Sequence, residues 1–238
     1  MEHYSRRYIL KTSLWTFGAL CFDLSRVVAS AIEPKNATAG RLNWDEFVHK
    51  LELTARAQHN ALWDKDSYVG SVARLLGRLD PLDPALQLMT SQHRNQGFVK
   101  PDFAELLKTT DVQISLITFG KGEWLPHHDH PSMTGVLTCA TGALLVDSYD
   151  RVQAPELAGP STIVLKKLES NVITPGNIST LTDKRRNVHS VRALSFTQVI
   201  DIFTPPYNSE RTSSTGWYRV ANRPIQGHEE LFIAHPYY

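Results

Sequence analysis

The feature that most constrains the fold is a series of short, apolar, β-branched segments that begins at residue 112 and continues to the end of the chain. Residues 112–117 alternate in part between apolar and polar side chains, which is typical of a half-buried strand. Glycine, proline, serine and asparagine separate the segments. Many short strands at regular spacing predict an all-β barrel or sandwich over residues 111–238. The further candidate strands are 135–140, 143–149, 162–165, 187–191, 194–203 and 231–234.

Residues 32–110 have a helical rather than a β pattern. Asn43, followed three residues later by a glutamate, has the spacing of a capping box that opens a helix. A second helix is expected over residues 66–79, and the same capping pattern at Asp102 predicts a short helix that ends near Lys108. These helices are too few to form a separate core, so we expect them to pack on the barrel.

Residues 1–31 have the layout of an export signal. Arg6 and Arg7 precede an apolar stretch, and small residues around Ala31 could form a cleavage site. The paired arginines resemble the twin-arginine type of signal, which predicts a periplasmic or exported protein. The alternative is an amphipathic N-terminal helix of a cytoplasmic protein. Cleavage after Ala31 would leave Cys139 as the only cysteine, so the mature chain could form no internal disulfide.

Composition excludes two classes of partner. The chain has 25 basic and 24 acidic residues and no basic stripe, which argues against a nucleic-acid-binding protein. It has no run of about 20 apolar residues, so we expect no membrane insertion after cleavage of the signal. We expect a monomer whose partners are small molecules.

The sequence LPHHDHPSM, residues 125–133, offers four possible metal ligands within four positions. Residues two apart on a strand point the same way. His128 and His130 are therefore predicted to face one side and His127 and Asp129 the other, outward, with substrate contact as an alternative for His127. Two histidines are too few for a stable site, and His189, at the start of a predicted strand, is the best candidate for a third ligand.

These residues resemble the first motif of the cupin barrels. Gly122, five further residues, His128-Asp129-His130 and then Gly142 match its pattern, but the usual glutamate before the last glycine is absent. Pro175-Gly176 followed by His189 loosely resembles the second motif. The resemblance implies a double-stranded β-helix, the cupin or jelly-roll barrel, as the mainly β fold.

An ordered set of motifs narrows the resemblance to the cysteamine dioxygenase and plant cysteine oxidase family of thiol dioxygenases. It covers about residues 114–237. The motifs are His128-Asp129-His130-Pro131-x-Met133-Thr134, Ser148-Tyr149-Asp150, Asn187-Val188-His189, Asp201-x-x-x-Pro205-Pro206-Tyr207 and Phe232-Ile233-Ala234-His235-Pro236-Tyr237.

The resemblance implies Fe(II) held by His128, His130 and His189. Three neutral imidazoles leave the ion its full charge, which favours an anionic thiolate and lowers the pKa of a bound thiol. The implied reaction adds both atoms of O2 to the sulfur of a small thiol or of a Cys-starting peptide and yields a sulfinate. Asp201 would orient a ligand or the substrate amine, or else be a surface residue. Tyr207 would line the pocket or donate a hydrogen bond to bound oxygen. The alternative is a tyrosine that only packs in the turn after the two prolines.

Three departures from the family pattern concern the substrate. Arg186 stands where the family usually has glycine, at the expected pocket rim. Gly135, Thr138 and Thr141 replace bulkier residues, which predicts a wider cavity. No cysteine is available near Tyr218 for the cross-link that some members form. Two other functions therefore stay open: another three-histidine cupin with a different metal or a carbon substrate, and a non-catalytic cupin that binds a metal or ligand.

Overall fold

The computed structural model describes residues 40–92, 101–157, 159 and 161–237. The predicted signal, residues 1–31, lies outside the described residues, as does the part of the helical segment over 32–39. The helices are α1 (Trp44–Ala55), η2 (Arg56–His59), α2 (Lys65–Leu76), α3 (Pro84–Gln92), η3 (Pro155–Leu157) and α4 (Ser209–Ser214). None of the helices in the described ranges is both long and apolar enough to cross a membrane.

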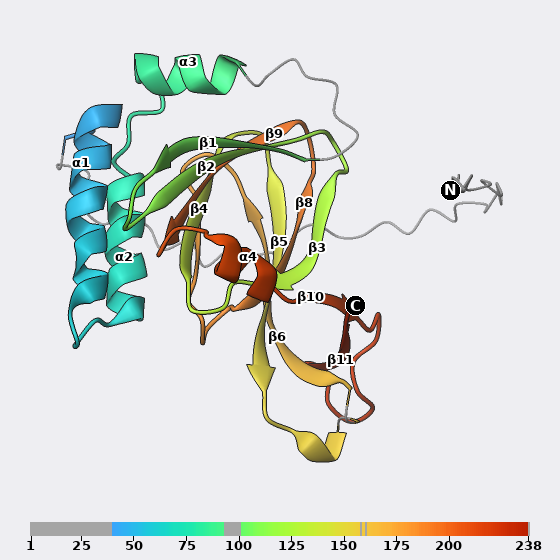
Figure 1. Cartoon of the computed structure of the whole chain (residues 1–238). Helices are drawn as coiled ribbons and strands as arrows, with labels where there is room; N and C mark the ends of the chain where they lie inside the picture. The colour runs from blue at the N-terminus through green and yellow to red at the C-terminus, as the bar shows by residue number, and fades with distance from the viewer. Residues whose placement is uncertain (1–39, 93–100, 158, 160, 238) are drawn as a thin grey trace, which may run out of the picture. The chain divides into compact units, whose positions relative to one another are not determined.

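Two sheets make up most of the described chain (Figure 1). One sheet has five strands in the order β1-β2-β9-β4-β7, and the other six strands close on themselves in the order β10-β11-β6-β5-β8-β3. The mainly β fold class, a double-stranded β-helix with a few helices near its N-terminal side, is confirmed. The strands are β1 (Asp102–Lys108), β2 (Gln113–Phe119), β3 (Trp124–Asp129), β4 (Thr134–Thr141), β5 (Leu144–Val152), β6 (Ile163–Ile173), β7 (Ile178–Leu181), β8 (Val188–Ala193), β9 (Thr197–Thr204), β10 (Trp217–Val220) and β11 (Leu231–Pro236).

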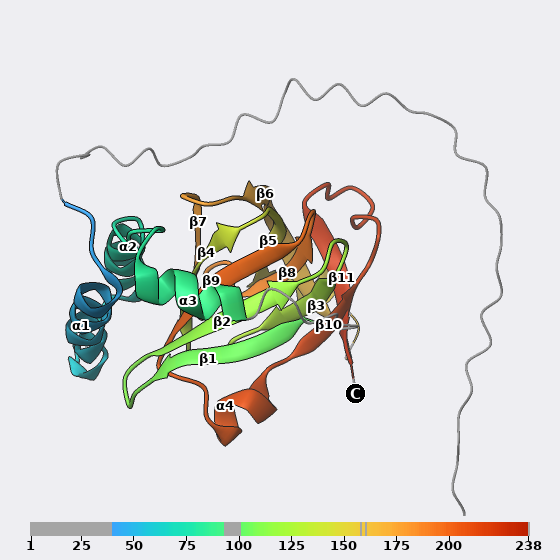
Figure 2. The ribbon, with the colours of Figure 1, turned by 90° about the horizontal axis from the view of Figure 1, so that it is seen from above.

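Helices α1 and α2 lie side by side next to the five-stranded sheet (Figure 2). The predicted capping box opens α1. The Asn43 side chain accepts a hydrogen bond from the Glu46 backbone N–H at 2.9 Å, and the Glu46 side chain accepts one from the Asn43 backbone N–H. Phe47 and Leu51 of α1 are fully buried in one core cluster with Ile200 of β9. Burial of each such side chain contributes about 1.5–3 kcal/mol, so the helices are held by packing on the sheet.

The predicted helix from Asp102 to Lys108 is wrong, because these residues form strand β1. Asp102 pairs with Thr118 and Lys108 with Gln113 along the edge of β2. The capping pattern is a local signal worth about 1 kcal/mol. The open backbone groups of β2 offer a full ladder of hydrogen bonds instead, and this tertiary pairing outweighs the local preference.

Candidate metal centre

The structure brings His128, His130 and His189 together. One ring nitrogen from each histidine lies within 4.8 Å of the others, and all three side chains are buried. His128 on β3 and His189 on β8 are direct partners in the antiparallel ladder, and His130 follows the last residue of β3. The separation of about sixty residues in sequence is therefore closed by strand pairing.

In two of these rings a hydrogen bond uses Nδ1 and leaves Nε2 free to bind a metal ion. His128 Nδ1 lies 2.7 Å from the Pro126 carbonyl oxygen, which can only accept, so Nδ1 carries the hydrogen and Nε2 keeps its lone pair. His130 Nδ1 is hydrogen-bonded to the Tyr207 hydroxyl. His130 Nε2 and His189 Nδ1 are buried and have no hydrogen-bond partner among the described residues. Unpaired buried nitrogens are costly, and a metal ion would satisfy them.

The three rings are neutral in the fold. Burial lowers the pKa of His128, and it lowers the pKa values of His130 and His189 well below the usual value of 6.5. The neighbouring histidines lower the pKa values of His130 and His189 further. Neutral imidazole is the ligand form that metals bind, so the cluster is ready for a divalent ion without first losing protons. The residues present fit the implied metal.

Trp217, which the sequence argument did not select, supports His128. Its ring stacks on the His128 ring at a centroid distance of 4.7 Å, and the two residues are paired between β10 and β3. The strands predicted from the sequence did not include residues 217–220, so no local pattern marked Trp217 as a neighbour of His128.

Asp129 turns away from the three histidines, as predicted, but it does not point outward into solvent. It is 5% exposed, and its carboxylate accepts hydrogen bonds from the Gly216 backbone at 2.6 Å and from the Tyr218 hydroxyl at 2.8 Å. Arg151 forms an ion pair with the same carboxylate. A carboxylate so well paired is stable in a buried site, and it ties β3 to β10 directly behind the histidines.

His127 faces away from the three-histidine cluster and packs edge-on against Tyr149, with ring centroids 5.3 Å apart. Burial lowers its pKa, while Asp147 raises it and Lys167 lowers it. It is therefore not one of the clustered ligands, in agreement with the alternation of side chains on β3.

A small cavity lies beside the cluster. His189 and Asp201 both line it, together with Gly135, Leu137, Val146, Ser148, Ser179, Thr180, Leu181, Arg186 and Phe203. The volume that the centre of a water molecule can occupy in it is about 10 Å³, which is room for roughly one water. The wider cavity expected from small side chains is not found. Phe203 and Leu181 fill the space beside Gly135, and Thr138 and Thr141 do not line the cavity.

Asp201 is buried on β9, opposite Ser115 and Leu137 of the neighbouring strands, so it is not a surface aspartate. Burial raises its pKa from 3.8 to about 7, against a smaller lowering by the Ile202 backbone. A carboxyl that titrates near neutrality beside the three-histidine cluster can hold or accept a proton.

Tyr207 lies against the cluster, with its ring packed on His130 and Phe203. Its backbone N–H donates to Gln113 Oε1 at 3.1 Å. Burial raises the pKa of the Tyr207 hydroxyl, and the charges of Asp201 and Asp129 raise it further, so the hydroxyl keeps its proton. If His130 binds a metal ion through Nε2, its Nδ1 carries the hydrogen and donates it to the Tyr207 oxygen, so the hydroxyl hydrogen remains available for another acceptor.

Comparison with known proteins agrees with this geometry. Residues 72–233, more than half of the chain, match the model of the PCO_ADO family. The chain belongs to the PCO_ADO family. The resemblance to cysteamine dioxygenases and plant cysteine oxidases is thereby confirmed.

Individual relatives are distant. A 2-aminoethanethiol dioxygenase of Homo sapiens is 23% identical over 171 residues, which cover 63% of this chain and 59% of that protein. The mouse (Mus musculus) protein of the same name is 25% identical over 146 residues, covering 53% and 57%. The chain thus spans less than two thirds of the length of these curated relatives.

Solved structures that resemble the chain include KdgF from Halomonas sp., with a TM-score of 0.37 and 17% identity over 50% of this chain and 93% of that one. A cupin superfamily protein from Desulfitobacterium hafniense gives a TM-score of 0.36 and 14% identity, covering 53% and 90%.

Proposed function

We propose that this protein is an Fe(II)-dependent thiol dioxygenase that oxidises a small aminothiol or an N-terminal cysteine to a sulfinate with O2. The observation that carries the proposal is the cluster of three buried, neutral histidines within 4.8 Å, in a chain of the PCO_ADO family. The two mammalian relatives above are named 2-aminoethanethiol dioxygenases, and 2-aminoethanethiol is a small aminothiol.

His128, His130 and His189 would hold the iron. When bound there, Fe(II) supplies electrons and open coordination positions at which a thiolate and O2 can meet. In the overall reaction R–SH and O2 give R–SO2H, so both oxygen atoms end on sulfur and no external reductant is needed.

The protein residues control protons and orientation. The Pro126 carbonyl and the Tyr207 hydroxyl orient His128 and His130 through their Nδ1 atoms. The free hydroxyl hydrogen of Tyr207 would donate to oxygen near the cluster. Asp201, with a pKa of about 7, would accept the thiol proton or pair with the substrate amine.

The test is oxygen uptake by protein loaded with Fe(II), across cysteamine, cysteine and Cys-starting peptides, with metal content measured on the same sample. We expect one O2 consumed per sulfinate formed. The His189→Ala variant should lose both iron and oxygen uptake, while His228→Ala, a change at an exposed histidine, should keep both. Absence of uptake with every thiol, in protein that holds iron, would refute the proposed reaction.

The alternatives predict different outcomes. Stoichiometric nickel, manganese or copper in protein purified without oxygen would favour another three-histidine cupin. Metal binding without turnover of any substrate would favour a binding protein.

Export through the twin-arginine route also remains our proposal, supported by the sequence of residues 1–31. The test is mass spectrometry of the N-terminus of protein recovered from each cell fraction. Recovery of intact chain from the cytoplasm alone would contradict export.

A further inference from the structure

Arg186 has an unusual backbone conformation for a residue with a side chain. Its φ is 54°, in the left-handed region that favours glycine. Glycine adopts this conformation without strain, so the backbone turn itself needs no side chain. A strained residue at the edge of a candidate site is a reason to look for a use of its side chain.

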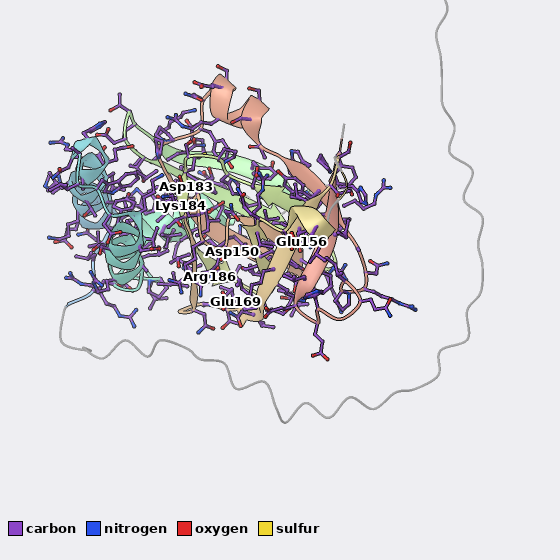
Figure 3. The ribbon with its side chains drawn as sticks, turned by 90° about the horizontal axis from the view of Figure 1, so that it is seen from below. Asp150, Glu156, Glu169, Asp183, Lys184 and Arg186 are labelled. Atoms are coloured by element: carbon purple, nitrogen blue, oxygen red, sulfur yellow. The ribbon has the colours of Figure 1, made fainter. Side chains whose placement is uncertain are left out.

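Two carboxylates, those of Asp150 and Glu169, hold Arg186 in place. Figure 3 labels the three residues. Asp150 on β5 accepts a hydrogen bond from the Arg186 backbone N–H. Glu169 on β6 accepts one from Arg186 Nε at 2.6 Å. The backbone and the inner edge of the guanidinium group are thus both fixed, and the orientation of the group is preset.

The outer edge of the guanidinium group is free. Within the described residues, no hydrogen bond uses the two terminal nitrogens of Arg186, and the side chain is 27% exposed. Arg186 also lines the small cavity that contains His189 and Asp201. A guanidinium group with two free N–H donors in one plane matches the two oxygens of a carboxylate.

We propose that Arg186 binds the carboxylate of the thiol substrate, so that the enzyme prefers a carboxylate-bearing thiol such as cysteine to cysteamine. This inference rests on the proposed thiol dioxygenase function and names the substrate class of the same site. Arg186 and Asp201 line one cavity with opposite formal charges, which match a substrate that carries both a carboxylate and an amine. Because the cavity has room for about one water, binding of a thiol requires side chains at its rim to move, and such side-chain changes on binding are common. A Cys-starting peptide has an amide at the position of that carboxylate and lacks this contact.

The experiment compares four thiols that differ only in these groups: cysteine, 3-mercaptopropionate, cysteamine and cysteine methyl ester. They are tested with the wild-type protein and with the Arg186→Gln and Arg186→Gly variants. Arg186→Gly suits the positive φ and so separates recognition from folding. Arg185→Gln is the matched control, because Arg185 is the exposed neighbour and does not line the cavity.

We expect both Arg186 variants to lower the ratio of kcat/KM for cysteine to kcat/KM for cysteamine by about tenfold or more, since two charge-assisted hydrogen bonds are lost. The change should lie in KM, and 3-mercaptopropionate should follow cysteine while the methyl ester follows cysteamine. Arg185→Gln should leave the ratio unchanged. A ratio that stays within twofold of the wild-type value in both Arg186 variants would overturn the inference.

Calorimetric binding of the same thiols to Fe(II)-loaded protein without oxygen separates this inference from the proposed function. If no thiol is oxidised, but carboxylate-bearing thiols bind more tightly and lose that advantage in the Arg186 variants, the proposed function fails and the inference stands. If all four thiols are oxidised and all lose activity equally, the function stands and the inference fails.

Discussion

Replacing Tyr207 with phenylalanine removes the hydroxyl that is hydrogen-bonded to His130 Nδ1 and leaves the ring packing in place. His130 is 4% exposed, so water does not readily replace the lost partner. The ring then loses the contact that directs Nε2 toward His128 and His189. Loss of such a supporting hydrogen bond costs about 10–100-fold in metal affinity, which corresponds to about 1.4–2.8 kcal/mol.

The assay for Tyr207→Phe is an anaerobic titration of Fe(II) against a chromophoric chelator. Tyr68→Phe is the matched control, because the Tyr68 hydroxyl is also buried and is hydrogen-bonded to Thr204 Oγ1 at 2.6 Å rather than to a histidine. We expect Tyr207→Phe to weaken Fe(II) binding and Tyr68→Phe to reduce only the free energy of unfolding. Wild-type affinity in Tyr207→Phe, or an equal loss in both variants, would refute the reasoning.

Two further predictions concern the stability of the metal-free protein. Burial raises the pKa of Asp201 from 3.8 to about 7, so this carboxyl favours the folded state most below pH 3.8, and that contribution is lost as pH rises toward 7. Asp201→Asn should therefore raise the free energy of unfolding by up to about 4 kcal/mol at pH 8 and by little at pH 4. The free energy is measured by urea unfolding at each pH, and a difference between variant and wild type that does not change with pH would contradict this. Gly135→Ala would place a Cβ 2.9 Å from Phe203 Cε1 and 3.0 Å from Leu181 Cγ, and overpacking of this kind lowers the free energy of unfolding by about 1–3 kcal/mol. Gly70→Ala, in helix α2 with its nearest contact at 3.8 Å, should instead raise it by about 0.5–1 kcal/mol, and the same sign in both variants would count against the packing argument.

Strand periodicity was sufficient to choose between the four candidate ligands of residues 127–130. The pleat sends His128 and His130 to one side, so their selection needed no tertiary information. The choice of His189 was less constrained by local pattern, and the pairing of β8 with β3 is what places it beside His128. The capping pattern at Asp102 gave a wrong prediction, because a short local pattern contains no information about the edge of β2 with which residues 102–108 pair.

The roles of Asp129 and Tyr207 depend on contacts that form only in the folded chain. The alternation of side chains predicted that Asp129 points away from His128 and His130. Its burial depends on hydrogen bonds from Gly216, in the loop before β10, and from Tyr218 of β10. Resemblance marked Tyr207, and only the structure shows that its hydroxyl bonds to His130.

The sequence by itself determined the strand-rich architecture, the helical N-terminal part and two of the clustered histidines, because these follow from side-chain period and local backbone chemistry. Tertiary structure alone decided which nitrogens stay unpaired, how small the cavity is and which groups surround Arg186. Those properties depend on contacts between residues of different strands and of both sheets. Contacts between strands distant in sequence leave no signal in any local stretch.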